Sequence, residues 1–120
     1  MNSDRAASVL DFAHVGEKLD RSGGGKRIAY SSPNLEIRVE VFTSPGPSEV
    51  RLEECDLLYL ALEGSGVLVL ETDDVLALVP GEAIVVPAGT RHVLFGNLRL
   101  TLLTVATPGW TAYGEVRSAI

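Results

Sequence analysis

The sequence is poor in residues that bind metals or form covalent cross-links. It contains a single cysteine, Cys55, and only two histidines, His14 and His92. One cysteine cannot form an internal disulfide, and neither a CxxC pair nor closely spaced histidines are present to indicate a structural zinc site. His14 lies in the N-terminal arm, residues 1–25, where we expect it at the surface or in packing.

The chain also lacks a long apolar run and an excess of basic residues. No run approaches the roughly 18 apolar residues that a membrane span needs, and the opening MNSDRAASVLDF has neither a basic start nor an apolar signal core. Sixteen acidic against ten basic residues give a net charge of −6, and the basic residues are scattered. We therefore expect a cytoplasmic protein that binds neither nucleic acid nor a membrane.

What the sequence does contain is a succession of short strands. With 120 residues, 46% of them hydrophobic, the chain is long enough for one domain with a core. Residues 26–31 predict a strand, and residues 35–42 alternate strictly between apolar and polar side chains. The apolar positions are expected to be buried, and the intervening side chains, Glu36, Arg38 and Glu40, are expected to face solvent.

Residues 56–70 predict a β-hairpin that turns at Gly64-Ser65-Gly66. Both faces of its first strand are apolar, one with Leu57, Tyr59 and Ala61 and the other with Leu58, Leu60 and Leu62. A strand of this kind must be covered on both sides. A second sheet is expected to cover the inner side, and the N-terminal arm or the other subunit of a homodimer the outer side.

Turns and strands alternate through the rest of the chain. Turns are predicted at residues 72–74, 80–81 and 87–90, and strands at residues 75–79, 83–86 and 92–106, the last divided in two near Gly96-Asn97. The strand at 83–86 is expected to be buried. Seven or more strands predict an all-β antiparallel sandwich or barrel at residues 26–107. The tail, residues 108–120, carries Trp110 and Tyr113 and is expected to pack on the barrel.

The stretch from residue 80 to residue 92 is similar to part of a known family. Gly81, Pro87, Gly89 and His92 follow one another at spacings of six, two and three, with Asn97 shortly after, and this pattern resembles the second conserved motif of the cupins. The run YLALEG, which ends at Gly64, resembles the end of the cupin first motif. The resemblance covers residues 35–105 and implies an antiparallel double-stranded β-helix, a jelly-roll barrel.

The same resemblance implies that the metal site of the family is incomplete here. Metal-binding cupins supply two histidines spaced by one residue and a glutamate four positions later, and these places hold Arg51, Glu53 and Leu57, so that only His92 remains. A first-row metal needs at least three converging ligands, and an arginine would repel it. We expect no cofactor, and the alternative is a divalent metal held by Glu53, His92 and a carboxylate or Cys55.

If the inward-facing positions of the family are kept, a ligand pocket in the barrel contains five residues: Arg51, Glu53, Leu57, Tyr59 and His92. Arg51 could hold a carboxylate or phosphate of the ligand, and His92 could transfer protons with Glu53 or Tyr59. Two alternatives remain open. Arg51 and Glu53 could lie at the barrel mouth, exposed or paired with each other, and Tyr59 could belong to the core.

Three functions are compatible with these residues. The first is a metal-free cupin that binds a small organic molecule, neutral or anionic, as a sensor or accessory protein. The second is a metal-free isomerase, epimerase or lyase that uses His92 as acid or base, with Glu53 or Tyr59 as the partner. The third is a metal-dependent cupin enzyme with an atypical ligand set. We rank them in this order, and the sequence does not identify the ligand or substrate.

Overall fold

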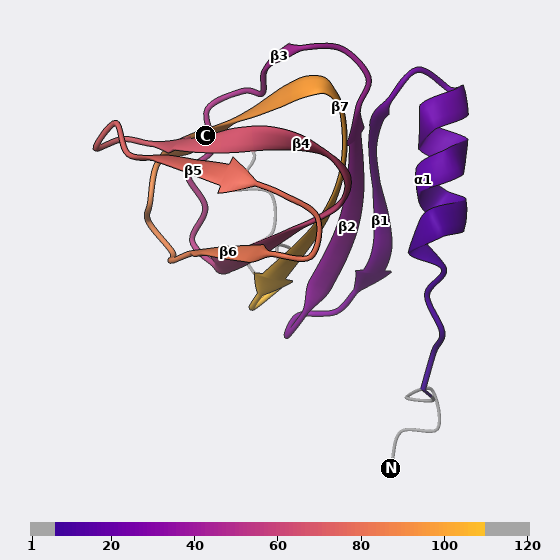
Figure 1. Cartoon of the computed structure of the whole chain (residues 1–120). Helices are drawn as coiled ribbons and strands as arrows, with labels where there is room; N and C mark the ends of the chain where they lie inside the picture. Colours follow the sequence, from indigo (N-terminus) through magenta and orange to yellow (C-terminus); the bar gives the residue numbers. More distant parts are fainter. Residues whose placement is uncertain (1–6, 110–120) are drawn as a thin grey trace.

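The computed structural model describes residues 7–109, in which one helix packs against a curled antiparallel sheet (Figure 1). The elements are α1 (Phe12–Arg21), β1 (Gly25–Ser31), β2 (Glu36–Phe42), β3 (Gly46–Pro47), β4 (Asp56–Leu70), β5 (Val75–Leu78), β6 (Ala83–Val86) and β7 (His92–Thr107). The strand order is β1-β2-β7-β4-β5, with β3 added to β7 and β6 added to β4. The predicted all-β antiparallel fold is confirmed. Among the described residues no helix is long and apolar enough to cross a membrane.

Two long strands, β4 and β7, form the centre of the sheet, and the predicted hairpin at residues 56–70 is wrong. β4 runs for 15 residues without reversing and pairs with β7, which has 16 residues, along its whole length. The register shifts between Ala61 and Glu63 and again between Gly64 and Gly66, which bends the strand. The predicted division of residues 92–106 into two strands near Gly96 is also wrong. Here, as in β4, the strand bends at a glycine and does not turn back.

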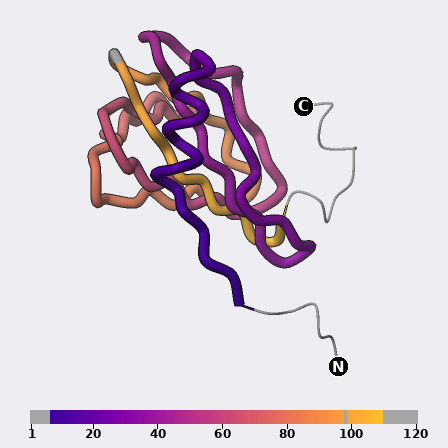
Figure 2. Tube along the Cα trace, turned by 90° about the vertical axis from the view of Figure 1, so that its right-hand side faces the viewer, coloured from indigo at the N-terminus to yellow at the C-terminus, as the bar shows by residue number. Residues whose placement is uncertain are grey.

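The bend in β4 lets one strand serve both halves of the barrel. Its first half pairs with β6 and with the C-terminal half of β7, and its second half pairs with β5 and with the N-terminal half of β7. The view turned by 90° shows α1 lying across the outside of this sheet (Figure 2). Polar side chains on β2, β4 and β7 therefore come from strands that curve around one interior.

The two faces of β2 are the reverse of those predicted. Glu40 lies opposite Leu102 of β7, and Leu102 lies opposite Ala61 of β4. Opposed residues of antiparallel strands point to the same side, and Leu102 and Ala61 belong to the core, so Glu40 points into the barrel. Glu36 and Arg38 share this face, and Glu36 and Glu40 are only 1% and 4% exposed. The charged face of β2 is thus an inner face.

The helix α1 explains this reversal. It packs on β1 and β2, and Val39 and Val41 on the outer face of β2 are 0% and 4% exposed. A Cβ added at Gly16 of the helix would lie 3.4 Å from Thr101 on β7, so the helix approaches the sheet closely. The helix begins after Asp11, whose side chain accepts a hydrogen bond from the backbone N–H of His14. The N-terminal arm thus contains ten helical residues, and His14, which we expected at the surface or in packing, is exposed on them.

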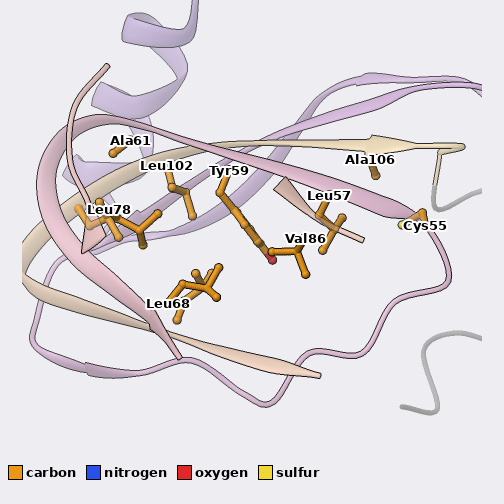
Figure 3. Packing of buried hydrophobic residues seen from close by; sticks show 11 residues of the cluster. Cys55, Leu57, Tyr59, Ala61, Leu68, Leu78, Val86, Leu102 and Ala106 are labelled. Carbon is orange, nitrogen blue, oxygen red and sulfur yellow. The ribbon is translucent and has the colours of Figure 1, made fainter. Parts of the chain in front are cut away.

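The apolar core lies between the curled strands, as Figure 3 shows. Leu57, Tyr59 and Ala61 of β4 point into it, at exposures of 2%, 0% and 1%. They share one face, as their alternation predicted, and the resemblance to the cupins implied this inward direction for Leu57 and Tyr59. The strand β6 was expected to be buried, but only its last residue, Val86, is. Val85 of β6 is 63% exposed because β6 lies beside β4 with its outer face uncovered.

The outer face that led us to expect a second subunit is present. Leu58 and Leu60 of β4 are half-buried there, next to the exposed Val85. The homodimer itself stays a prediction, which the mass of the particle in solution would test. The predicted packing of the tail concerns Trp110 and Tyr113, and both lie outside the described residues.

Candidate functional site

A buried ion pair joins two sides of the barrel. The backbone of Arg51 exchanges two hydrogen bonds with that of His92 at the start of β7, with N···O distances of 2.8 and 2.9 Å. From there the Arg51 side chain reaches β2, where Nη1 and Nη2 donate to the two carboxylate oxygens of Glu40 at 2.9 and 2.6 Å. The two side chains are 7% and 5% exposed. Arg51 is therefore buried and paired with Glu40, and is not exposed at the barrel mouth as the alternative had it.

The charges of this pair stabilise each other. Burial alone would raise the pKa of Glu40, but the hydrogen bonds and the charge of Arg51 outweigh it, so the pKa lies below its usual value. Burial alone would likewise lower the pKa of Arg51, and Glu40 reverses that effect and raises it. Thr104 Oγ1 also donates to Glu40, at 3.2 Å. Both groups are thus charged, and the pair forms a fixed dipole inside the barrel.

A second hydrogen-bonded pair, Tyr59 and His92, lies beside the first. The phenol oxygen of Tyr59 is 2.8 Å from His92 Nε2, and His92 Nδ1 is 2.9 Å from the carbonyl oxygen of Thr90. A carbonyl only accepts, so Nδ1 carries the proton and Nε2 accepts from the phenol. The two side chains are 0% and 1% exposed. Both ring nitrogens of His92 are therefore occupied by internal hydrogen bonds.

Burial keeps both members of this second pair neutral. It raises the pKa of Tyr59 to about 12, although the nearby charge of Arg51 acts in the opposite direction. Burial also lowers the pKa of His92, and the positive charge of Arg51 adds to this effect, while the hydrogen bond to Thr90 opposes it. At neutral pH the pair has no charge to offer, and proton exchange with a bound molecule requires the core to open.

The depressed pKa of His92 predicts a loss of stability in mild acid. The unfolded chain takes up a proton near pH 6.5 while folded His92 does not, so the free energy of unfolding falls as the pH drops below about 6.5, at up to about 1.4 kcal/mol per pH unit. Urea unfolding between pH 7.5 and 5 measures this slope. A His92→Gln variant is expected to show a flatter profile, and an equally steep profile would contradict the assignment.

The residues at the metal positions of the cupin motif do not fit a divalent metal. Arg51 holds its charge in the barrel, Leu57 is apolar, and both nitrogens of His92 are engaged. Within residues 7–109 no three His, Cys, Asp or Glu side chains lie close enough together to hold an ion. The alternative set of Glu53, His92 and Cys55 is therefore not assembled there. The prediction that no metal is bound stays a prediction.

A cleft opens next to the ion pair, between β1, β2 and the segment that follows β3. Its volume is about 320 Å³, and its polar lining comes from five residues, Lys26, Glu40, Ser48, Glu49 and Arg51. Phe42 and Pro47 form its apolar wall. A larger hollow of about 650 Å³ lies outside the barrel, between α1 and Leu62. We place the candidate site in the smaller cleft because two of its charged groups, Glu40 and Arg51, are fixed by burial.

The structure resembles solved proteins of one fold over most of its length. A cupin superfamily protein from Desulfitobacterium hafniense is 25% identical, with 70% of this chain and 76% of that chain covered and a TM-score of 0.66. An RmlC-like cupin protein from Desulfovibrio desulfuricans is 23% identical, with 90% and 97% covered and a TM-score of 0.65. The protein has the cupin fold. No protein-family model matches the sequence, and no curated protein is significantly similar to it.

The similarity of this cupin-fold protein to its neighbours fixes the architecture and not the activity. KdgF from Halomonas sp. covers 94% of each chain with a TM-score of 0.67, at only 17% identity. At this level of identity the likeness shows the fold alone, and one fold carries many activities. The function therefore depends on the residues at the cleft.

Of the charged residues that line the cleft, Arg51 was predicted from the sequence and the others were not. Of the five predicted pocket residues, Arg51 lines the cleft, Leu57, Tyr59 and His92 lie in the core, and Glu53 is half-buried. The missed residues are Glu40, Lys26 and Glu49. Glu40 could have been found from the expected inward position of Arg51. A buried arginine needs a carboxylate partner, and the alternate positions of β2 include two carboxylates, Glu36 and Glu40.

Proposed function

We propose that this cupin-fold protein binds a small organic anion in the cleft beside Arg51, as a sensor or accessory protein. The observation that carries the proposal is the pair of cations, Lys26 and Arg51, that line one cleft. A volume of about 320 Å³ is at the lower end of the range for ligand pockets, which corresponds to a metabolite of few atoms.

The fixed geometry of Arg51 supports a binding role. Its two hydrogen bonds to Glu40 hold the guanidinium in place before any ligand arrives, which lowers the entropic cost of binding. A guanidinium has five N–H donors, so the two bonds to Glu40 and the contact with Tyr59 still leave donors for a further acceptor. Arg51 Nε is buried and has no hydrogen-bond partner within the described part of the chain. The cleft thus offers one oriented cation and one flexible one.

The chemistry of the cleft favours binding over proton transfer. A general acid or base must reach the substrate directly or through one water. Tyr59 and His92 are almost completely buried, and neither lines the cleft. The carboxylate of Glu40 is held by Arg51 and Thr104, and its lowered pKa makes it a poor base. The metal-free isomerase, epimerase or lyase is accordingly the weaker candidate.

A thermal-shift screen of small carboxylates and phosphates tests the proposal. Ligands that bind the folded state raise the melting temperature in proportion to the logarithm of their excess over Kd. We expect at least one saturable shift, and we expect Lys26→Ala to weaken the binding of that compound by about three- to tenfold in isothermal titration, since one charge-assisted contact is lost.

The chain offers a matched control for Lys26→Ala. Arg91 and Glu71 form an ion pair at 3.8 Å with exposures of 50% and 70%, close to the 3.6 Å, 50% and 65% of Lys26 and Glu49, but away from the cleft. Arg91→Ala removes the same charge and is expected to leave binding unchanged. A screen without any shift, or equal losses in the two variants, would reject the proposal.

A further inference from the structure

Glu49 is held near the cleft by an arch of two residues. Ser48 before it is fixed to β7, because its backbone N–H donates to the Leu94 carbonyl at 2.7 Å and its hydroxyl accepts from the Leu94 N–H at 3.0 Å. Arg51 after it is fixed to β7 by the two backbone bonds to His92. Between these anchors Glu49 and Val50 are exposed. The backbone position of Glu49 is therefore set, while its side chain keeps freedom to move.

The carboxylate of Glu49 faces both cations of the cleft without bonding to either. Its Oε2 lies 3.6 Å from Lys26 Nζ and 3.9 Å from Arg51 Nη2, and the side chain is 65% exposed. These distances exceed those of a hydrogen bond, so the attraction is a weak, solvent-screened one. A hydrogen bond from its own backbone N–H and the two positive charges lower the pKa of Glu49. The group is therefore a charged but loosely held carboxylate.

Glu40 differs from Glu49 in every one of these respects. It is buried, accepts two short hydrogen bonds from Arg51 and one from Thr104, and cannot leave without exposing an unpaired buried charge. With both glutamates in place the two cations of the cleft are balanced. Without Glu49 one positive charge remains in excess. The cleft thus has room for one exchangeable negative charge.

We infer that Glu49 is a resident competitor that occupies the anion position of the cleft, and that the ligand is an organic monocarboxylate which displaces it. The inference rests on the proposed function and adds the class of ligand and the residue that limits its affinity. The incoming carboxylate takes over the contacts to Lys26 and Arg51, and its organic part meets the apolar wall at Phe42 and Pro47. The Glu49 side chain turns into solvent, which costs little because the side chain is already largely exposed.

Titration calorimetry with benzoate tests the inference. Benzoate carries one carboxylate on an apolar ring, and benzamide has the same shape without the charge. We expect Glu49→Gln to bind benzoate about three- to tenfold more tightly than the wild type, while the affinity for benzamide stays the same. Glu71→Gln removes a glutamate of similar exposure away from the cleft and is expected to leave the benzoate affinity unchanged.

Several outcomes separate this inference from the proposed function. Tighter benzoate binding by Glu49→Gln alone supports the competitor role, including the case in which only this variant binds measurably. Equal benzoate affinity of the wild type and Glu49→Gln, or no binding by both, overturns the inference. If the carboxylate and phosphate screen still gives a shift that depends on Lys26, the proposed function stands without the competitor. Equal gains for benzoate and benzamide would show a steric effect, which also overturns it.

Discussion

Replacing Arg51 with methionine is expected to destabilise the protein by about 3 to 5 kcal/mol, measured by urea unfolding at pH 7. Methionine has a similar length and no charge, so the main change is the loss of the partner of Glu40. The Glu40 side chain is 5% exposed, and its carboxylate would be left with the hydrogen bond from Thr104. An isolated buried carboxylate must take up a proton or pull in water, and either process costs free energy.

The double variant Glu40→Leu with Arg51→Met distinguishes this explanation from a loss of packing. Removing both charges leaves an apolar contact and one unpartnered Thr104 hydroxyl, which costs about 1 to 2 kcal/mol. We therefore expect the double variant to be more stable than Arg51→Met alone by at least about 1 kcal/mol. Arg91→Met, in an exposed ion pair, is expected to cost less than about 1 kcal/mol. A double variant that is no more stable than Arg51→Met would contradict this explanation.

The alternation of apolar and polar residues in β2 could be predicted from the sequence. Which of the two faces points into the barrel could not. Period two shows that Glu36, Arg38 and Glu40 share a face. Which face is inside depends on what covers the other one, and the answer lies in α1, more than ten residues away in the chain. The amphipathic helix α1 covers the apolar outer face of β2 and keeps it from water, so the polar face can point into the barrel. The usual rule that apolar residues point to the centre of a barrel failed at this strand.

The inward positions of β4 were predicted correctly from the resemblance to the cupins. Both faces of the strand are apolar, so the alternation alone does not say which one is inside, whereas the inward-facing positions of the family placed Leu57 and Tyr59 in the barrel, and both lie in the core. His92 was placed by the turn before it, where Gly89 has a φ of 83° and the Thr90 N–H bonds back to Pro87 at 3.2 Å. Local turn chemistry therefore located His92, whereas its bond to Tyr59, 33 residues away, is a product of the fold.

The glycines of β4 show the limit of local turn chemistry. Gly64 has a φ of 80°, which a hairpin turn and a bulge both use, so the residue type alone does not separate them. The deciding fact is the partner strand. A Cβ at Gly64 would lie 2.0 Å from the carbonyl oxygen of Arg99, and one at Gly66 would lie 2.3 Å from that of Phe95. Both glycines are needed because β7 passes close to them at the bend.

Substituting Gly64 with alanine is accordingly expected to cost at least about 4 kcal/mol, an effect as large as that of Arg51→Met. The positive φ alone accounts for about 1 to 2 kcal/mol. The rest comes from the overlap with the backbone of Arg99, which a flexible side chain could relieve but a paired strand cannot. Urea unfolding measures the loss.

Gly81→Ala separates these two contributions. Gly81 has a φ of 88°, and a Cβ added there meets nothing within 4 Å, so its substitution carries the backbone strain without the overlap. We expect Gly81→Ala to cost about 1 to 2 kcal/mol. Equal losses at the two positions would mean that β4 and β7 can move apart at the bend. In that case the long paired strands would not hold Arg51 and Glu40 at a fixed separation, and the preorganised cleft would lose its physical basis.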